Sequence, residues 1–266
     1  MNCPVCSNNK FEQSIVIKQR LIEEWELNLE EVDYINKQQG LYCTECFSNF
    51  RSMTLAHSIM QYFSLKGNFQ QVRYSRIGKR KKLLEINEAG NLHSIFRLFK
   101  NYIFAEYPEI DIQKLPYNDE TFDIVVHSDT LEHVNDTSMA LKECNRVLKT
   151  GGALFYTIPI INGRLTKKRD GLSKSYHGSQ DEGQGEDYLV WTEYGADFWL
   201  EINRAGFNEI RLYTLENEST IAICAKKNEQ RNYLAQKFLF NRFIFILTRK
   251  KIKKIWTLRV KDLFQK

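Results

Sequence analysis

Short apolar runs alternate with helical patterns from Leu83 to about Lys227, and this alternation restricts the possible folds more than any other feature of the sequence. Such an order is typical of a doubly wound α/β sheet, in which helices cover both faces of mainly parallel strands. The apolar centre of residues 122–127 fits a strand that is buried on both faces. We therefore predict an α/β fold.

The pattern predicts strands at residues 82–86, 101–106, 122–127, 153–158, 210–215 and 220–225. The link between the last two is too short for a parallel crossover, so we expect them to form an antiparallel pair. One helix is predicted from the capping residue Asp136 to Leu148, and another from about Thr192 to Arg204. The expected sheet is parallel and ends in an antiparallel hairpin.

Three segments carry a resemblance to a known family. They are Asp111–Val125 (DIQKLPYNDETFDIV), Leu131–Val134 (LEHV) and Arg146–Gly152 (RVLKTGG). In order and spacing they resemble the class I S-adenosylmethionine-dependent methyltransferases of the type-11 kind, over about residues 83–227. The resemblance implies a Rossmann-like sheet of seven strands and methyl transfer from S-adenosylmethionine.

The resemblance assigns cofactor contacts to residues near the carboxyl ends of strands, where open α/β sheets bind ligands. Glu85 would receive the methionyl ammonium group, and Glu106 would accept both ribose hydroxyls. Asp111 would accept a hydrogen bond from the adenine amino group, with Ile112 against the ring. His127 leaves a later strand at the same edge and is included among the predicted cofactor-binding residues.

The first turn departs from the family pattern, because Asn87 and Ala89 stand where glycines are usual. Glycine there lets the backbone approach the cofactor closely. Asparagine adopts positive φ more readily than most residues, and Gly90 adds local freedom. We predict that Asn87 and Gly90 shape a rebuilt cofactor turn; a non-catalytic relative that has lost cofactor binding is the alternative.

His133 is the leading candidate for the base that removes a proton from the methyl acceptor, because an imidazole titrates near neutral pH. The alternative is a histidine that bonds a backbone carbonyl and only holds its loop. Residues 162–193 form a predicted acceptor lid, since insertions at the carboxyl edge of a sheet usually shape substrate access. His177, within this lid, is the second base candidate. The lid's mixed charges favour a polar, multiply hydroxylated acceptor.

Four cysteines form two Cys-x-x-Cys pairs near the start of the chain: Cys3, Cys6, Cys43 and Cys46. Two such pairs supply the four thiolates of a tetrahedral zinc site. Since all four positions come from protein, we predict a structural Zn²⁺ in a zinc ribbon rather than a catalytic metal. Disulfides or unrelated buried thiols are the alternative. The insert between the pairs carries Ile22, Trp25 and Leu29 at helical spacing and is predicted to be helical.

Charge is divided unevenly along the chain. Residues 225–266 hold 13 Lys or Arg and 2 Asp or Glu. The preceding residues hold 25 Lys or Arg and 31 Asp or Glu. A uniformly basic nucleic-acid surface is therefore excluded. Aromatic and basic residues within 238–256 predict a basic amphipathic helix that lies on an anionic membrane. A helix packed on the core or on a partner is one alternative, and RNA binding is another.

We predict four parts: a zinc ribbon at residues 1–50, a helical connector at 51–81, a methyltransferase domain at 82–227 and the basic tail at 228–266. The start of the chain lacks the basic and apolar regions of a signal peptide, so we expect a cytoplasmic protein, held at the inner face of the membrane through residues 230–266. A ribbon joined to such a core resembles a subgroup common in glycan and sugar biosynthesis. The predicted function is S-adenosylmethionine-dependent methylation of a sugar or glycolipid intermediate. An RNA methyltransferase and a non-catalytic scaffold are the alternatives.

Overall fold

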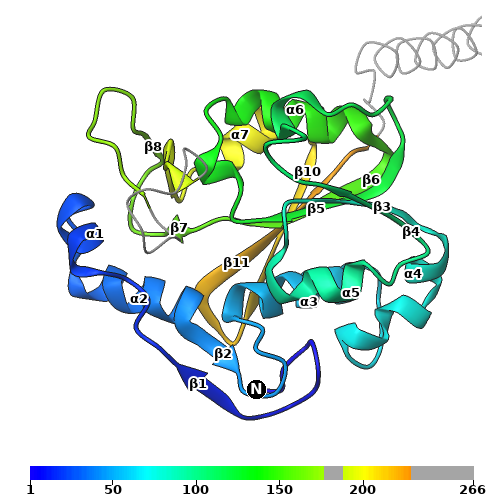
Figure 1. Ribbon diagram of the computed structural model, residues 1–266, viewed down its shortest axis with the longest axis horizontal. Coiled ribbons are helices and arrows are strands. Elements are labelled where there is room, and N and C mark those ends of the chain that lie inside the picture. The colour runs from blue at the N-terminus through cyan, green and yellow to red at the C-terminus, as the bar shows by residue number, and fades with distance from the viewer. Residues whose placement is uncertain (177–187, 229–266) are drawn as a thin grey trace, which may run out of the picture. The chain divides into compact units, whose positions relative to one another are not determined.

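A six-stranded mixed sheet crosses the middle of the described part of the chain, which is residues 1–176 and 188–228 of a computed structural model (Figure 1). Its strands lie in the order β10-β11-β6-β5-β3-β4. Their bounds are β3 (Lys82–Ile86), β4 (Asn101–Ala105), β5 (Phe122–Ser128), β6 (Leu148–Thr157), β10 (Glu209–Leu215) and β11 (Asn217–Lys226). The strands predicted from the sequence are confirmed, with bounds that differ by a few residues.

The central strands are parallel and the last two are not. β3 pairs in parallel with β4 and with β5, and β5 pairs in parallel with β6. β11 runs antiparallel to both β6 and β10, which confirms the expected terminal hairpin. The chain passes from β3 to β4 on one side and returns to β5 on the other, so the strand order reverses at β3. Ligands of open α/β sheets bind at the carboxyl ends of the strands at such a reversal.

The six strands of this sheet are one fewer than the seven that the resemblance implies. After β4 the chain makes only a short turn before the 3₁₀-helix η3 (Ile112–Lys114), and then enters β5. There is no room in this connection for a further helix and strand. The sheet therefore ends at β4 on this side, and the Rossmann-like fold is otherwise retained.

Helices cover both faces of the sheet, as the double winding requires. Figure 1 shows α6 (Thr137–Val147) and α7 (Trp199–Arg204) on one face, with α3 (Phe50–Tyr62) and α5 (His93–Phe96) on the other. The segment expected to be a connector also contributes η1 (Phe69–Tyr74) and α4 (Arg76–Arg80) to this second layer. The predicted cap of α6 is confirmed, because the Asp136 side chain accepts a hydrogen bond from the Met139 amide at 2.9 Å.

The helix predicted over Thr192–Arg204 is wrong in its first half. Thr192–Gly195 is a strand, β9, which pairs with β7 (Ile160–Ile161) and β8 (Lys167–Lys168) in a small second sheet. All four residues of β9 are buried. Pairing with strands distant in sequence therefore overrides the local pattern, and the helix α7 begins only at Trp199.

The residues before the main sheet form a small ribbon with a helical insertion. β1 (Phe11–Gln13) pairs antiparallel with β2 (Leu41–Cys43), and α1 (Gln19–Glu24) and α2 (Leu29–Gly40) lie between them in sequence. The insert is helical as predicted, but Leu29 does not continue the first helix. Asn28 and Glu31 form a capping box that starts α2, and Leu29 is 87% exposed.

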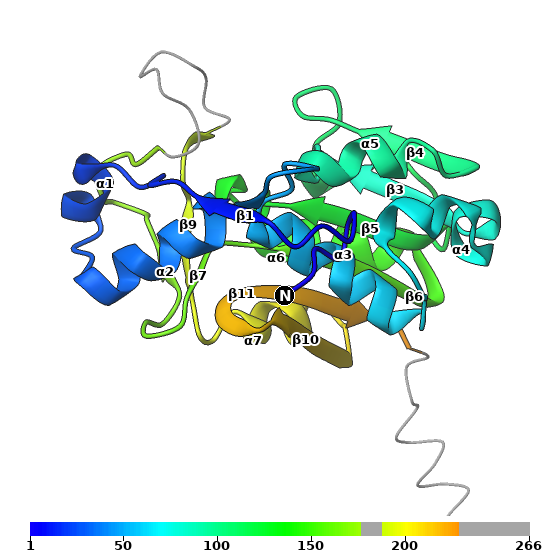
Figure 2. The ribbon, with the colours of Figure 1, turned by 90° about the horizontal axis from the view of Figure 1, so that it is seen from below.

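The insertion lies on the same side of the molecule as the small sheet. Figures 1 and 2 both show α2 on the side of the molecule that carries β7, and the two elements are in contact. Buried residues of the two parts form one apolar cluster, which includes Trp25 and Ile35 of the insertion with Ile161 and Val190. Within the described residues, no helix has the length and apolar character needed to cross a membrane.

Candidate active site

The turn after β3 has the conformation that the sequence suggests. Asn87 has a φ of +52° and Gly90 a φ of +55°, both in the left-handed region. The Asn87 amide donates to the Ala105 carbonyl at 2.8 Å, and the Asn87 Oδ1 accepts from the Tyr107 amide at 3.0 Å. Asparagine thus supplies both the backbone geometry and a side-chain bond that joins the ends of β3 and β4.

Glu85 is fully buried inside this turn. Its Oε1 accepts a hydrogen bond from the Ala89 amide at 2.9 Å, and its Oε2 accepts from the Tyr102 hydroxyl at 2.6 Å and from His93 Nδ1 at 2.9 Å. Burial raises the pKa of the Glu85 carboxyl, and these three donors oppose the rise. The carboxyl group therefore holds the turn from within together with His93, and its contact with the methionyl ammonium group stays a prediction.

Glu88 points its charge away from the buried part of the turn. It is exposed, and its Oε1 lies 3.6 Å from His93 Nε2. A cavity of about 400 Å³ opens beside the turn, between ribbon residues that include Cys46 and turn residues that include Glu88 and Gly90. The helix α3 also closes on the turn, because a Cβ on Gly90 would lie 2.7 Å from Ser52 Oγ. The turn is therefore packed between the ribbon and α3.

The segment after β4 carries the residues predicted to bind ribose and adenine. Glu106 is exposed directly after the strand. Asp111 caps η3 by accepting a hydrogen bond from the Gln113 amide at 2.8 Å, and the Gln113 side chain also donates to it. Ile112 is buried and belongs to the core under α6. The structure thus gives Asp111 and Ile112 defined positions, and their cofactor contacts stay a prediction.

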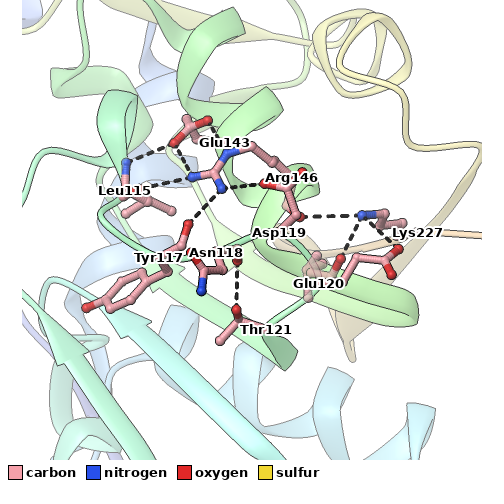
Figure 3. Close-up of polar contacts among 10 residues, drawn as sticks. Leu115, Tyr117, Asn118, Asp119, Glu120, Thr121, Glu143, Arg146 and Lys227 are labelled. Carbon is pink, nitrogen blue, oxygen red and sulfur yellow. Dashed lines mark hydrogen bonds and ion pairs between the residues drawn. The ribbon is translucent and has the colours of Figure 1, made fainter.

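Arg146 of α6 holds the chain between η3 and β5, as Figure 3 shows. Its guanidinium group donates to the carbonyl oxygens of Leu115 (3.0 Å) and Tyr117 (2.7 Å) and pairs with Asp119 and Glu143. Glu143 in turn accepts from the Leu115 amide at 2.9 Å. This network ties the segment that follows Asp111 to α6, so the arginine of the RVLKTGG segment fixes the approach to the candidate adenine site.

His127 lies inside the sheet rather than at its surface. It is fully buried and stacks on Tyr156 with 4.7 Å between ring centroids. Neither ring nitrogen has a hydrogen-bond partner among the described residues. Burial lowers the pKa of His127 to about 3. Its predicted contact with the cofactor is untested, and in the structure it is a buried, neutral side chain near the end of β5.

Substitution of His127 by phenylalanine is expected to make the protein less sensitive to acid. The unfolded chain binds a proton at this histidine near pH 6.5, whereas the folded protein binds it only near pH 3, so the wild type loses stability as the pH falls between these values. At pH 5 the loss amounts to about 2 kcal/mol relative to pH 7. Urea unfolding of both proteins at the two pH values measures it, and an equal loss in both would show that His127 titrates normally.

Three ionisable side chains meet in a buried cluster at the carboxyl end of β5: Arg51, Asp129 and Glu132. Arg51 Nη1 of α3 lies 2.6 Å from Asp129 Oδ1. Glu132 is completely buried, and neither of its carboxyl oxygens has a hydrogen-bond partner among the described residues. Burial raises the pKa of Asp129 and raises that of Glu132 well above its usual value, and the charge of Asp129 raises the latter further. Glu132 lies within the LEHV segment, and no role was predicted from the sequence for any of these three residues.

His133 lies beside this cluster with a defined orientation. Its Nδ1 is 3.1 Å from the Leu189 carbonyl oxygen, and its Nε2 is 3.9 Å from Glu132 Oε1. A carbonyl oxygen can only accept, so Nδ1 carries the proton in this bond and a neutral ring keeps its lone pair on Nε2. The bond to a carbonyl therefore orients the ring, and it is also the contact expected of a histidine that holds its loop. His177, the other base candidate, lies outside the described residues.

The four predicted metal ligands come together at the start of the chain. Their sulfur atoms all lie within 4.8 Å of one another. The two knuckles have the same form, because Ser7 and Phe47 each follow the second cysteine with positive φ and donate their amide to the carbonyl of the first (2.8 and 2.9 Å). Backbone amides and the Asn8 side chain outweigh burial and lower the pKa of Cys43 to about 6. Four convergent thiols fit a tetrahedral metal such as Zn²⁺.

Comparison with known proteins finds similarity in the part of the chain that contains the parallel strands of the main sheet. Residues 82–156 match a family model described as a methyltransferase domain. A stretch of 51 residues is 47% identical to the ubiquinone/menaquinone biosynthesis C-methyltransferase UbiE of Teredinibacter turnerae, and it covers 19% of this chain and 20% of that protein. The UbiE of Enterobacter sp. (strain 638) is 33% identical over 122 residues, 43% of this chain and 42% of that protein. The chain thus spans less than half of these curated relatives.

Among solved structures, one similar protein is a Thermotoga maritima S-adenosylmethionine-dependent methyltransferase described as a possible histamine N-methyltransferase. It is 16% identical, with a TM-score of 0.40, and the match covers 67% of this chain and 90% of that one. The family match spans β3, β4, β5 and nearly all of β6, which include the strands on both sides of the reversal. Residues 82–156 are therefore similar to a methyltransferase domain.

Proposed function

We propose that the protein transfers a methyl group from S-adenosylmethionine to a polar, multiply hydroxylated small molecule, such as a sugar or a glycolipid intermediate. The methyltransferase segment at residues 82–156 carries the proposal, because it contains the reversal of strand order at which this fold binds ligands. Two carboxyl groups that follow β5, those of Asp129 and Glu132, support an acceptor that offers hydroxyl protons. They oppose a phosphate-rich acceptor such as RNA.

The proposed cofactor contacts run along the carboxyl edge of the sheet. Glu106 would bind the ribose hydroxyls, and Asp111 with Ile112 the adenine ring. Arg51 is a buried cation that pairs with Asp129 just after β5, and its neighbour Ser52 lies against the cofactor turn, so we assign Arg51 to the carboxylate of the cofactor. The backbone of the turn at Asn87 would lie under the methionyl part.

S-adenosylmethionine supplies an electrophilic methyl group bound to a positively charged sulfur. The protein's own task is to align the acceptor for in-line displacement and to receive its proton. His133 Nε2 is the proposed proton acceptor, because Nδ1 is committed to the Leu189 carbonyl. The Glu132 carboxyl group lies 3.9 Å from this nitrogen. The acceptor oxygen gains the methyl group as its proton moves to His133.

Substitution of Glu106 by glutamine is expected to weaken binding of S-adenosylhomocysteine about 10-fold, because one strong acceptor for the ribose hydroxyls is lost. Isothermal titration calorimetry measures the dissociation constant. Glu109→Gln is the matched control, since Glu109 is an exposed acid three residues further on. No binding by the wild type at millimolar concentration would overturn the methyltransferase proposal, and equal affinities of the Glu106→Gln and Glu109→Gln variants would overturn the ribose assignment.

The acceptor class can be tested without knowing the acceptor. The protein is incubated with S-adenosylmethionine that carries a tritiated methyl group, together with separate fractions of small polar metabolites, lipid-linked glycans and RNA. We expect label in the first or second fraction. Label confined to RNA would support the alternative in which ribbon and tail bind nucleic acid.

The four-cysteine cluster is proposed to hold one structural Zn²⁺. Four thiolates leave no open coordination position, so the metal would support the fold rather than take part in methyl transfer. Metal analysis of the purified protein should give one zinc per chain.

The basic tail at residues 230–266 is proposed to bind anionic membranes. It lies outside the described residues, and its composition supports the proposal, since each Lys or Arg near an anionic leaflet contributes about 1 kcal/mol. The full chain is expected to co-sediment with vesicles that contain 30% phosphatidylserine, and a chain without residues 230–266 is not. Equal sedimentation of both would contradict the proposal, whereas salt-sensitive RNA binding lost with the tail would assign it to nucleic acid.

A further inference from the structure

The insertion between the two cysteine pairs forms an ion pair and hydrogen bonds with the segment that follows β7. Arg164 Nε and Nη2 donate to the two carboxylate oxygens of Glu31 at 2.5 and 2.6 Å. Its Nη1 and Nη2 also donate to the carbonyl oxygens of Trp25 and Glu26, at 2.6 and 2.8 Å. A bidentate ion pair with two further backbone bonds fixes position as well as contributing energy. The small sheet is therefore anchored to the insertion rather than only to the methyltransferase core.

A short series of hydrogen bonds connects the insertion to the candidate base. Trp25 Nε1 donates to Ser175 Oγ at 3.0 Å, and the Ser175 carbonyl accepts from the Val190 amide at 2.9 Å. On either side of Val190, the Leu189 carbonyl accepts from His133 and the Trp191 amide donates to the Glu132 carbonyl at 2.8 Å. Residues 189–191 thus contact the insertion through Val190 and the 131–133 loop through their ends.

Burial makes this connection rigid. Trp25 is 6% exposed, Ser175 is fully buried and Val190 is 2% exposed. The Val190 side chain belongs to the same apolar cluster as Trp25, so packing and hydrogen bonding act together. A displacement of the insertion would therefore move the Leu189 carbonyl, which selects the protonated nitrogen of His133.

We propose that the insertion is part of the acceptor site, with Trp25 and Arg164 as positioning residues that hold residues 189–191 and thereby orient the imidazole of His133. The catalytic consequence rests on the proposed function, in which His133 Nε2 receives the acceptor proton. The helical insertion of the ribbon thus has a role distinct from that of its cysteines. The cysteines fold the ribbon, and the insertion controls the geometry of the base.

The tautomer of His133 provides a test that does not require a known acceptor. Long-range ¹H–¹⁵N correlation spectra of the full chain labelled with ¹⁵N-histidine, recorded at pH 8, show which ring nitrogen carries the proton, and His133→Gln assigns the signal. We expect the wild type to hold the Nδ1–H form. Trp25→Phe and Arg164→Gln should convert more than half of His133 to the Nε2–H form, which a free imidazole side chain prefers.

Lys37→Gln is the control, because Lys37 belongs to the same insertion but pairs with Asp33 on its exposed face. Its His133 signal should match that of the wild type. Ser175→Ala provides a variant in which the insertion is intact and the link is cut, in case Trp25→Phe does not fold. An unchanged tautomer in folded Ser175→Ala and Arg164→Gln proteins would overturn the proposal. Failure of the wild type to bind S-adenosylhomocysteine would instead overturn the methyltransferase function and leave the tautomer result standing.

Discussion

Replacement of Cys43 by serine is expected to release the metal and to lower the midpoint of thermal unfolding by about 10–20 °C. Structural zinc contributes about 10 kcal/mol or more to the folding of small zinc domains, and a loss of only half of this shifts the midpoint of a domain of this size by that amount. The effect should reach beyond the ribbon, because Cys3 and Cys43 belong to the same buried cluster as Phe50 and Met53 of α3. Differential scanning calorimetry and metal analysis of the purified variant measure the two effects.

Cys224→Ala is the matched control for this experiment. Cys224 is also a fully buried thiol, but it lies on β11 and is outside the four-cysteine cluster. The Cys224→Ala variant should keep one zinc per chain. Its free energy of unfolding should fall by about 1 kcal/mol, as expected for a small cavity. A Cys43→Ser protein that retains zinc and stability would refute the structural metal site, and a wild type without metal would do the same.

The methyltransferase core was predictable because its signals are local. The apolar runs at residues 82–86 and 122–127 have the length and burial pattern of central strands, and Asp136 marks the start of α6 by a capping bond within one turn. The four cysteines were grouped by spacing alone, since each Cys-x-x-Cys turn brings two sulfur atoms together without help from the rest of the chain. Where a local rule decides the geometry, the sequence is sufficient.

The incorrect predictions concern segments whose structure is determined by contacts with residues distant in sequence. Residues 192–195 have an ambiguous pattern and become β9 only because β7 and β8 offer edges to pair with. Leu29 fits the spacing of the first helix, yet the capping box at Asn28 begins a second one. The seventh strand was implied by family resemblance, whereas the short connection after β4 leaves no place for it.

In the candidate site, too, local features were predictable from the sequence and contacts between distant residues were not. Asn87 and its left-handed conformation follow from residue type, and His133 follows from its motif. Arg51 lies far from Asp129 in sequence, and no periodicity or spacing connects them. The one available signal was an arginine between Phe50 and Met53 in the first turn of α3, a residue type that is rarely buried without a partner. An ion pair between residues so distant in sequence can be identified only once the fold is known.

Replacement of Arg51 by methionine is expected to destabilise the folded protein by about 3–5 kcal/mol at pH 7, since removal of one partner leaves a buried charge without compensation. Arg51 is 8% exposed, and Asp129 and Glu132 lie in the same buried cluster. Without the guanidinium, the pKa of Asp129, already raised by burial, rises further. A raised folded-state pKa gives stability at low pH that is lost as the pH rises, so the deficit should shrink towards pH 5. Urea unfolding at both pH values measures this change.

The double variant Arg51→Met/Asp129→Asn separates the two roles assigned to Arg51. Asparagine tolerates the positive φ of 50° at position 129 and removes the orphaned charge, so the double variant should regain most of the lost stability. Its affinity for S-adenosylhomocysteine should nevertheless stay at least about 10-fold weaker than that of the wild type, because the cofactor carboxylate still lacks its cation. Asp129→Asn alone keeps Arg51 and serves as the reference for any effect of the asparagine. Recovery of both stability and affinity in the double variant would mean that Arg51 only neutralises Asp129, and the cofactor carboxylate would then have to find its partner among the backbone amides of the turn at Asn87.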